Sequence, residues 1–191
     1  MTRGAPVFPI FLRLAGRPVV LVGGGRVAAG KLEGLLRGGA RVTVVAPEVQ
    51  GELERDGVTL VRRAFEPRDL DGAWFAVAAA PPDVNRQVAE AAEERRIFVN
   101  AVDDPPSSSA YAGGVFRRGS LTVAISTDGD APALAGLVRE GLEALVPDDI
   151  ETWLELSREQ TRLWRETKIP MADRRPRLLE ALNRLYSERT Q

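Results

Sequence analysis

A glycine-rich turn near the N-terminus has residue types and spacing that suit the binding of a dinucleotide. The run Gly23-Gly24-Gly25-Arg26-Val27-Ala28 satisfies the pattern G-x-G-x-x-A. Small residues let the backbone approach a pyrophosphate, and the free N–H groups at the start of a helix attract its negative charge. The pattern also fits a purely structural turn. Its place between an expected strand and an expected helix favours a nucleotide site over Gly23–Val27.

The ribose of such a nucleotide should lie about twenty residues further on, at the end of the second strand. That strand is expected to end at Ala46, and Pro47 and Glu48 follow it. An acidic residue here binds the ribose hydroxyls of NAD, whereas an arginine accepts the 2′-phosphate of NADP. Glu48 is present and no arginine follows, so the sequence favours NAD. An equally good interpretation makes Glu48 a solvated loop residue that caps the next helix.

Asp103 and Asp104 are candidates for proton transfer. The chain has no histidine and no cysteine, and its lysines are Lys31 and Lys168. A Ser-His-Asp triad, thiolate chemistry and Cys/His zinc sites are therefore excluded, and a carboxylate is the leading candidate for a general base. Asp103 follows a strand expected at 97–102, where parallel sheets bind ligands. The alternative is a loop aspartate that caps a turn before a proline.

A second group of polar residues lies further along the chain and could bind an anionic substrate. Its members carry hydroxyl or guanidinium groups: Arg117, Arg118, Ser126, Thr127 and Arg139. Arginine forks suit carboxylates and phosphates. The alternatives are helix-capping roles for the hydroxyls and a solvated surface for the arginines. The arginines beyond residue 150 alternate with glutamates and are typical of a solvated helix face.

The elements that position these residues alternate between strand and helix up to about residue 103. Valine-rich apolar runs predict buried strands, and apolar residues at helical spacing predict helices. Strands are expected at 17–23, 41–46, 58–62, 73–79 and 97–102, and helices at 27–38 and 84–95, the latter capped by Asp83. This order predicts an α/β fold with a Rossmann-like parallel sheet.

Beyond that point the pattern changes. Residues 114–117 and 120–126 predict a hairpin that turns at Arg118-Gly119, and 131–145 predicts an amphipathic helix. Charged helical sequence follows, with breaks at Pro170 and Pro176. We therefore expect a nucleotide-binding domain at 1–112, a small region at 113–146 that lacks its own core and dimerises, and a helical domain at 147–191.

Composition narrows the choice of partners. Twenty-six basic against 27 acidic residues give a formal net charge of -1. This balance argues against a general nucleic-acid binder. No stretch is long enough to span a membrane, so we expect a cytoplasmic protein with no membrane partner.

Taken together, the motifs resemble a known family. GGGRVAAGK (23–31), NAVD (100–103) and AISTDGDAPALA (124–135) occur in this order after the start PIFLRL. The combination is similar to the precorrin-2 dehydrogenase/sirohydrochlorin ferrochelatase family of siroheme synthesis, over about residues 7–145. The resemblance implies oxidation of precorrin-2 to sirohydrochlorin with NAD as hydride acceptor, and in some members insertion of ferrous iron as a substrate.

The resemblance also implies roles for particular residues. Asp103 matches the family's catalytic aspartate, and Gly23–Val27 with Pro47 and Glu48 match its nucleotide contacts. It further implies a tetrapyrrole substrate, a homodimer and no resident metal. The segment Ser109–Gly114 departs from the family pattern because it lacks a proline, which bears on the macrocycle pocket and on iron insertion more than on dehydrogenation.

Two other functions compete with this one. A non-enzymatic NAD-binding sensor would keep the glycine turn and need no base at Asp103, but it gives no reason for the segment 124–140. A short reductase would usually carry a tyrosine–lysine pair, and the tyrosines of this chain have no lysine nearby in the sequence.

Overall fold

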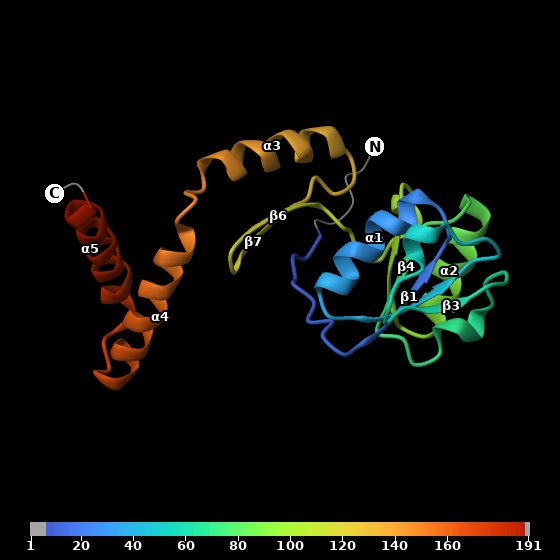
Figure 1. Ribbon diagram of the computed structural model, residues 1–191, viewed down its shortest axis with the longest axis horizontal. Coiled ribbons are helices and arrows are strands. Elements are labelled where there is room, and N and C mark those ends of the chain that lie inside the picture. The colour runs from blue at the N-terminus through green and yellow to red at the C-terminus, as the bar shows by residue number, and fades with distance from the viewer. Residues whose placement is uncertain (1–6, 190–191) are drawn as a thin grey trace. The chain divides into compact units, whose positions relative to one another are not determined.

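The computed structural model describes residues 7–189, and the side chains of residues 7–185 (Figure 1). The chain divides between Ala112 and Gly113 into two compact units. The first unit carries the glycine turn and Asp103. The second carries the hairpin and the C-terminal helices. Each unit is described by itself.

The first unit is built on a five-stranded parallel sheet with the order β3-β2-β1-β4-β5. Its strands are β1 (Pro18–Val22), β2 (Arg41–Val45), β3 (Thr59–Val61), β4 (Phe75–Ala78) and β5 (Phe98–Ala101). The strand order reverses between β1 and β4, where parallel sheets of this kind bind their ligands. The predicted Rossmann-like fold is therefore confirmed.

Two helices cover opposite faces of this sheet. The apolar face of α1 (Arg26–Arg37) packs Leu32 against Leu21 in one cluster, and α2 (Pro82–Glu94) packs Val88 against Val20 in the other. Successive residues of a strand point to opposite faces, so the unbroken apolar run of β1 supplies both cores. This packing fixes the start of α1 directly beyond the end of β1.

The loop after β5 covers the free edge of the sheet. Ser108 Oγ accepts a hydrogen bond from Ala101 N and donates to the carbonyl oxygens of Ala101 and Asp104. Ser109 Oγ accepts a hydrogen bond from Val99 N at 2.9 Å. The serine side chains thus satisfy edge N–H groups that a sixth strand would otherwise pair. A short helix, η3 (Pro105–Ser107), lies inside this loop.

The second unit consists of a hairpin and three helices. The hairpin pairs β6 (Gly114–Arg118) with β7 (Leu121–Ile125), and α3 (Pro132–Leu145) packs against it with Phe116 and Ala135 buried. Two further helices contact each other, α4 (Ile150–Glu166) and α5 (Met171–Arg189). Among the helices within residues 7–189, none is long and apolar enough to cross a lipid bilayer.

Three local predictions need correction. Asp83 lies inside the first turn of α2 and is not its N-cap, because the helix begins at Pro82, whose fixed φ suits a first helical position. The hairpin turns one residue later than predicted, at Gly119-Ser120, since Arg118 still pairs with Leu121. Pro176 lies inside α5 and does not end it, whereas Pro170 does separate α4 from α5.

Candidate nucleotide-binding and catalytic site

The glycine turn between β1 and α1 is built from close backbone approaches. A Cβ added to Gly23 would lie 2.2 Å from Ala79 O, and one added to Gly24 would lie 1.7 Å from Glu48 O. Gly23 also has a φ of 127°, a conformation that a side chain disfavours. These two glycines are therefore required by the protein's own packing.

Gly25 is different, because a Cβ there would meet nothing within 4 Å. It is the N-cap of α1, and no side chain caps this helix. The first N–H groups of the helix therefore have no capping side chain and remain available to a ligand. Ala28, the last small residue of the motif, is fully buried beneath them, where it lets the helix approach the sheet.

A cavity of about 690 Å³ opens beside this turn. Its lining joins the glycine turn to the ends of β2 and β4 and to the loop after β3. The lining residues are Val22–Gly25, Val45–Gln50, Ala64, Phe65, Ala79–Pro81 and Val84. A mostly apolar cavity beside unpaired helix N–H groups fits a molecule with a flat apolar ring and a phosphate. The residues present thus fit a dinucleotide.

The structure brings five of the seven predicted nucleotide-binding residues into this lining. They are Gly23, Gly24, Gly25, Pro47 and Glu48. Arg26 and Val27 are exposed in the first turn of α1, outside the lining residues.

The two arginines that follow β3 are already paired. Arg62 and Arg63 follow β3 directly, and they bind Glu54 and Asp69, each with a closest distance of 2.5 Å. Neither arginine therefore has a free guanidinium group that could bind a 2′-phosphate. Glu48, by contrast, lines the cavity as an exposed carboxylate.

Asp103 lies at the same carboxyl edge of the sheet but outside the lining residues of the cavity. Val102, one residue before it, donates its N–H to Ala78 O at 2.8 Å, which ties the end of β5 to the end of β4. Asp103 has a φ of 57°, in the left-handed region, and its side chain is exposed. Such a conformation is uncommon for a residue other than glycine, and the loop after β5 holds it.

The predicted substrate-binding residues all belong to the second unit. Arg118 donates to Val146 O and lies 3.4 Å from Asp148, and Arg139 is paired with Glu140 and Glu143. Arg117 is exposed on β6, and it has no partner among the described residues. Of the three predicted arginines, Arg117 is the one whose guanidinium is free to take a ligand.

Ser126 and Thr127 cap the turn before α3. Ser126 Oγ accepts a hydrogen bond from Asp128 N at 3.1 Å, and Thr127 Oγ1 accepts one from Ala131 N at 3.3 Å. These contacts correspond to the capping roles that the sequence left open for them.

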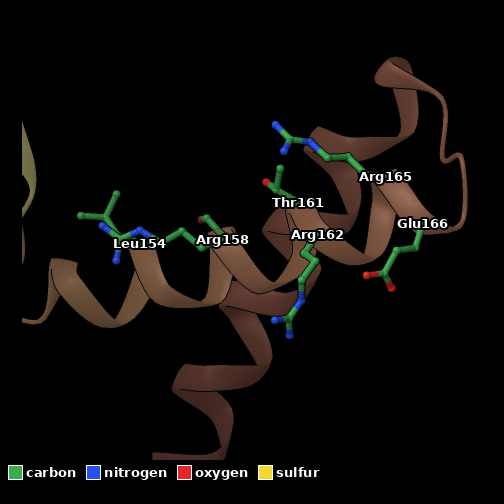
Figure 2. A pocket seen from close by; sticks show the side chains of 7 residues that line it. Leu154, Arg158, Thr161, Arg162, Arg165 and Glu166 are labelled. Atoms are coloured by element: carbon green, nitrogen blue, oxygen red, sulfur yellow. The ribbon is translucent and has the colours of Figure 1, made fainter.

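A second hollow, also of about 690 Å³, lies on the second unit and is lined by one helix, α4 (Figure 2). Arg158, Arg162 and Arg165 surround it together with Thr161. Arg158 is bound to Glu151 at 3.3 Å and to Ser120. Because one helix forms the whole lining, this hollow is an open surface between arginine side chains.

Sequence reasoning missed the wall of the first cavity that follows β3. Ala64 and Phe65 line it, and Arg63 on one side and Asp69 on the other hold this loop. Asn85, buried in α2, was missed too: its Oδ1 accepts a hydrogen bond from Ala80 N at 3.0 Å beside the cavity. The signal in the sequence was weak, since no glycine pattern marks either segment.

Within the described part of the chain, no group of three or more His, Cys, Asp or Glu side chains is arranged to hold a metal ion. Fold and cavity together define a dinucleotide-binding Rossmann domain. The model of the family described as putative NAD(P)-binding matches residues 10–114, and that of the sirohaem biosynthesis protein central region matches 118–145. The chain therefore belongs to the NAD(P)-binding family of siroheme synthesis that the sequence motifs indicated.

Individual relatives agree with this assignment. The chain is 46% identical over 147 residues to siroheme synthase 3 of Aeromonas hydrophila and 47% identical over 147 residues to siroheme synthase of Citrobacter koseri. These matches cover 74% of this chain but 31% and 32% of the relatives, so the chain spans about a third of their length. The solved structure of SirC, a precorrin-2 dehydrogenase, matches with a TM-score of 0.71 and 28% identity, covering 91% of this chain and 88% of that one.

Proposed function

We propose that this chain catalyses the NAD-dependent dehydrogenation of precorrin-2 to sirohydrochlorin. The observation that carries the proposal is the pairing of an uncapped helix N-terminus beside an apolar cavity with Asp103 at the same sheet edge. The similarity to SirC along most of both chains supports the same reaction. Residues 1–112 serve as the nucleotide domain, 113–146 as the dimerisation region and 147–191 as the helical domain.

NAD, not NADP, is the proposed cofactor. Glu48 in the cavity accepts hydrogen bonds from ribose hydroxyls and repels a 2′-phosphate. Arg62 and Arg63, which directly follow β3, are occupied by Glu54 and Asp69.

The chemistry divides between cofactor and protein. When bound, the nicotinamide accepts a hydride from the substrate. Asp103 takes the proton that leaves with it, so that two hydrogens leave precorrin-2 and one negative charge on the protein is neutralised. Gly25 and the start of α1 hold the pyrophosphate, and Arg117 binds a peripheral carboxylate of the tetrapyrrole.

Insertion of ferrous iron into sirohydrochlorin is a second proposed activity. The names of the relatives favour it, because siroheme is the iron-containing product. The ring nitrogens of the substrate would bind the iron, and Asp103 would accept the pyrrole protons that the iron displaces. Ferrous iron is then a substrate of the protein.

A homodimer is the proposed assembly. On α3, Leu134, Val138, Leu142 and Leu145 recur at a spacing of three to four residues and are 38–78% exposed, and Leu137 beside them is 67% exposed. An apolar stripe of this length on a soluble helix is typical of a protein–protein contact.

The test is anaerobic incubation of the protein with precorrin-2 and NAD, followed by absorbance spectroscopy. We expect sirohydrochlorin only when NAD is present, and siroheme after ferrous iron is added. Asp103→Asn keeps the left-handed backbone and removes the charge, so it should bind NAD normally and lose turnover about 100-fold or more.

Asp104→Asn is the matched control, and it should retain turnover within about threefold. NAD binding without any spectral change would replace the dehydrogenase with the sensor. Normal turnover by Asp103→Asn would remove Asp103 from the mechanism.

A further inference from the structure

The loop after β3 forms a wall of the cofactor cavity that no sequence motif predicted. Ala64 and Phe65 both line the cavity, and Phe65 also packs against the core cluster that contains Leu70. Among the described lining residues, Phe65 is the one aromatic side chain. A flat apolar face of this kind suits contact with an aromatic base.

An ion pair between Arg63 and Asp69 joins the two ends of this loop outside the cavity lining. Arg63 Nη1 and Nη2 donate to Asp69 Oδ2 and Oδ1 at 2.8 and 2.5 Å, which is a two-bond fork. Arg63 Nη1 also donates to Ala64 O at 2.9 Å. The guanidinium is thus attached both to Asp69 and to the backbone of the residue next to Phe65.

Asp69 is itself fixed. Its side chain is 9% exposed, and its Oδ2 accepts a hydrogen bond from Glu66 N at 2.9 Å. The Arg63 guanidinium holds the pKa of the Asp69 carboxyl below its ordinary value. The carboxylate therefore ties both ends of the segment 63–66 to the short helix η2 (Pro67–Leu70).

Beyond the fork, the loop is held by a capping box between Glu66 and Asp69 and by the packing of Phe65 against the core. Ala64 is exposed, and Pro67–Leu70 form a single 3₁₀ turn with Glu66 as its N-cap. Loss of the fork removes two side-chain hydrogen bonds from the segment, and loss of the Arg63 guanidinium removes a third, to Ala64 O.

We infer that the Arg63–Asp69 pair is a positioning device for the cofactor: it holds Phe65 as the aromatic wall against which the base of the dinucleotide packs. Neither charged residue lines the cavity. The pair therefore acts through Phe65 and not by touching the ligand. The inference rests on the proposed function only in taking NAD as the ligand.

The test is a double-mutant cycle on the affinity for NAD, measured by isothermal titration calorimetry on the full chain. Asp69→Asn keeps the shape and removes the charge, and Phe65→Leu keeps an apolar side chain and removes the ring. If loss of the fork reduces the population of the binding-competent loop conformation to about a tenth, the Kd for NAD rises about tenfold.

Because both changes act on one wall, Asp69→Asn should add less than twofold in the Phe65→Leu background. In turnover assays the KM for NAD should rise with the Kd, while kcat at saturating NAD and the KM for precorrin-2 stay the same. If the pair had a merely structural role, its loss would lower Tm without raising the KM for NAD selectively.

Glu33→Gln is the matched control. Like Asp69, Glu33 is a carboxylate in an ion pair; its partners are Arg37 and Arg55, and it lies outside the cavity lining. It should change the Kd by less than twofold. Should Asp69→Asn fail to fold, Arg63→Lys, which keeps the charge but loses the fork, should raise the Kd about threefold.

The outcomes are distinct. Wild-type protein that binds no NAD overturns the proposed cofactor. Wild-type binding together with unchanged affinity in Asp69→Asn or Arg63→Lys overturns the positioning role alone. Independent, additive effects of Asp69→Asn and Phe65→Leu would also overturn it.

Discussion

Two neighbouring glycines should fail in different ways when each is replaced by alanine. At Gly24 the new Cβ would lie 1.7 Å from the carbonyl oxygen of Glu48, so the backbone would have to separate by about 1.3 Å to reach 3.0 Å. The obstacle is backbone, so the cost lies near the upper end of overpacking, about 3 kcal/mol. For a chain of this size that lowers Tm by about 6–12 °C.

At Gly25 the new Cβ meets nothing, and the φ of -95° and ψ of -174° are open to alanine. The folded protein therefore loses only the small difference between glycine and alanine at an N-cap, about 0.5–1 kcal/mol. The methyl group stands where a phosphate would approach the helix. Loss of one or two charge-assisted hydrogen bonds should raise the Kd for NAD about 100-fold.

The assay pairs thermal unfolding without ligand with calorimetric titration of NAD. Gly24→Ala should lower both Tm and affinity, whereas Gly25→Ala should lower affinity strongly and Tm by only about 1–4 °C. Affinity within threefold of wild type in Gly25→Ala would refute the role of the turn in binding phosphate. A wild-type Tm in Gly24→Ala would refute the close packing against Glu48.

Three further predictions concern other parts of the chain. The pKa of Asp69 is lowered in the folded protein, so its ion pair stabilises the fold at neutral pH, and this stability is lost as pH falls through the lowered pKa. In urea unfolding, the free energy of unfolding of Asp69→Asn should be about 1–2 kcal/mol below that of wild type, and this difference should narrow below the ordinary pKa of 3.8. A difference that does not change with pH would contradict this prediction. Ser108→Ala removes the side-chain hydrogen bonds that hold the loop carrying Asp103, so kcat should fall about tenfold with an unchanged Kd for NAD. Ser107→Ala is the control and should change neither quantity. Equal effects of the two variants would contradict the role of Ser108 in positioning Asp103. Leu137→Glu places a charge on the exposed stripe of α3 and should convert the proposed dimer to a monomer in light scattering, and a monomeric wild type would remove the dimer altogether.

Much of the first unit could be predicted because its signals are local. The run of β1 is apolar at every position that the sheet buries on either face, and the glycine turn follows it without interruption. Residues that are neighbours in the sequence form this part of the site. The positions of Gly25 and Ala28 are therefore dictated by the strand-to-helix turn itself.

Other features depend on contacts between distant residues. The need for glycine at positions 23 and 24 comes from the backbone of Ala79 and Glu48, which lie far along the chain. Likewise, Arg118 and Arg139 look like free cations in the sequence, but Asp148 and Glu143 occupy them in the structure. Sequence patterns report residue types, whereas only the folded chain decides which charges are already paired.

The sequence by itself thus determined the parallel α/β fold, the nucleotide turn and, by the absence of histidine and cysteine, the carboxylate as the leading base. These follow from periodicity and side-chain chemistry, which are local properties of the chain. The tertiary structure alone decided that Asp103 adopts a left-handed conformation at the sheet edge and that Arg117 remains unpaired among the three predicted arginines. Both depend on long-range packing and hydrogen bonding. The loop that carries Asp103 is held, and the other two arginines are neutralised, through contacts that exist only in the folded chain.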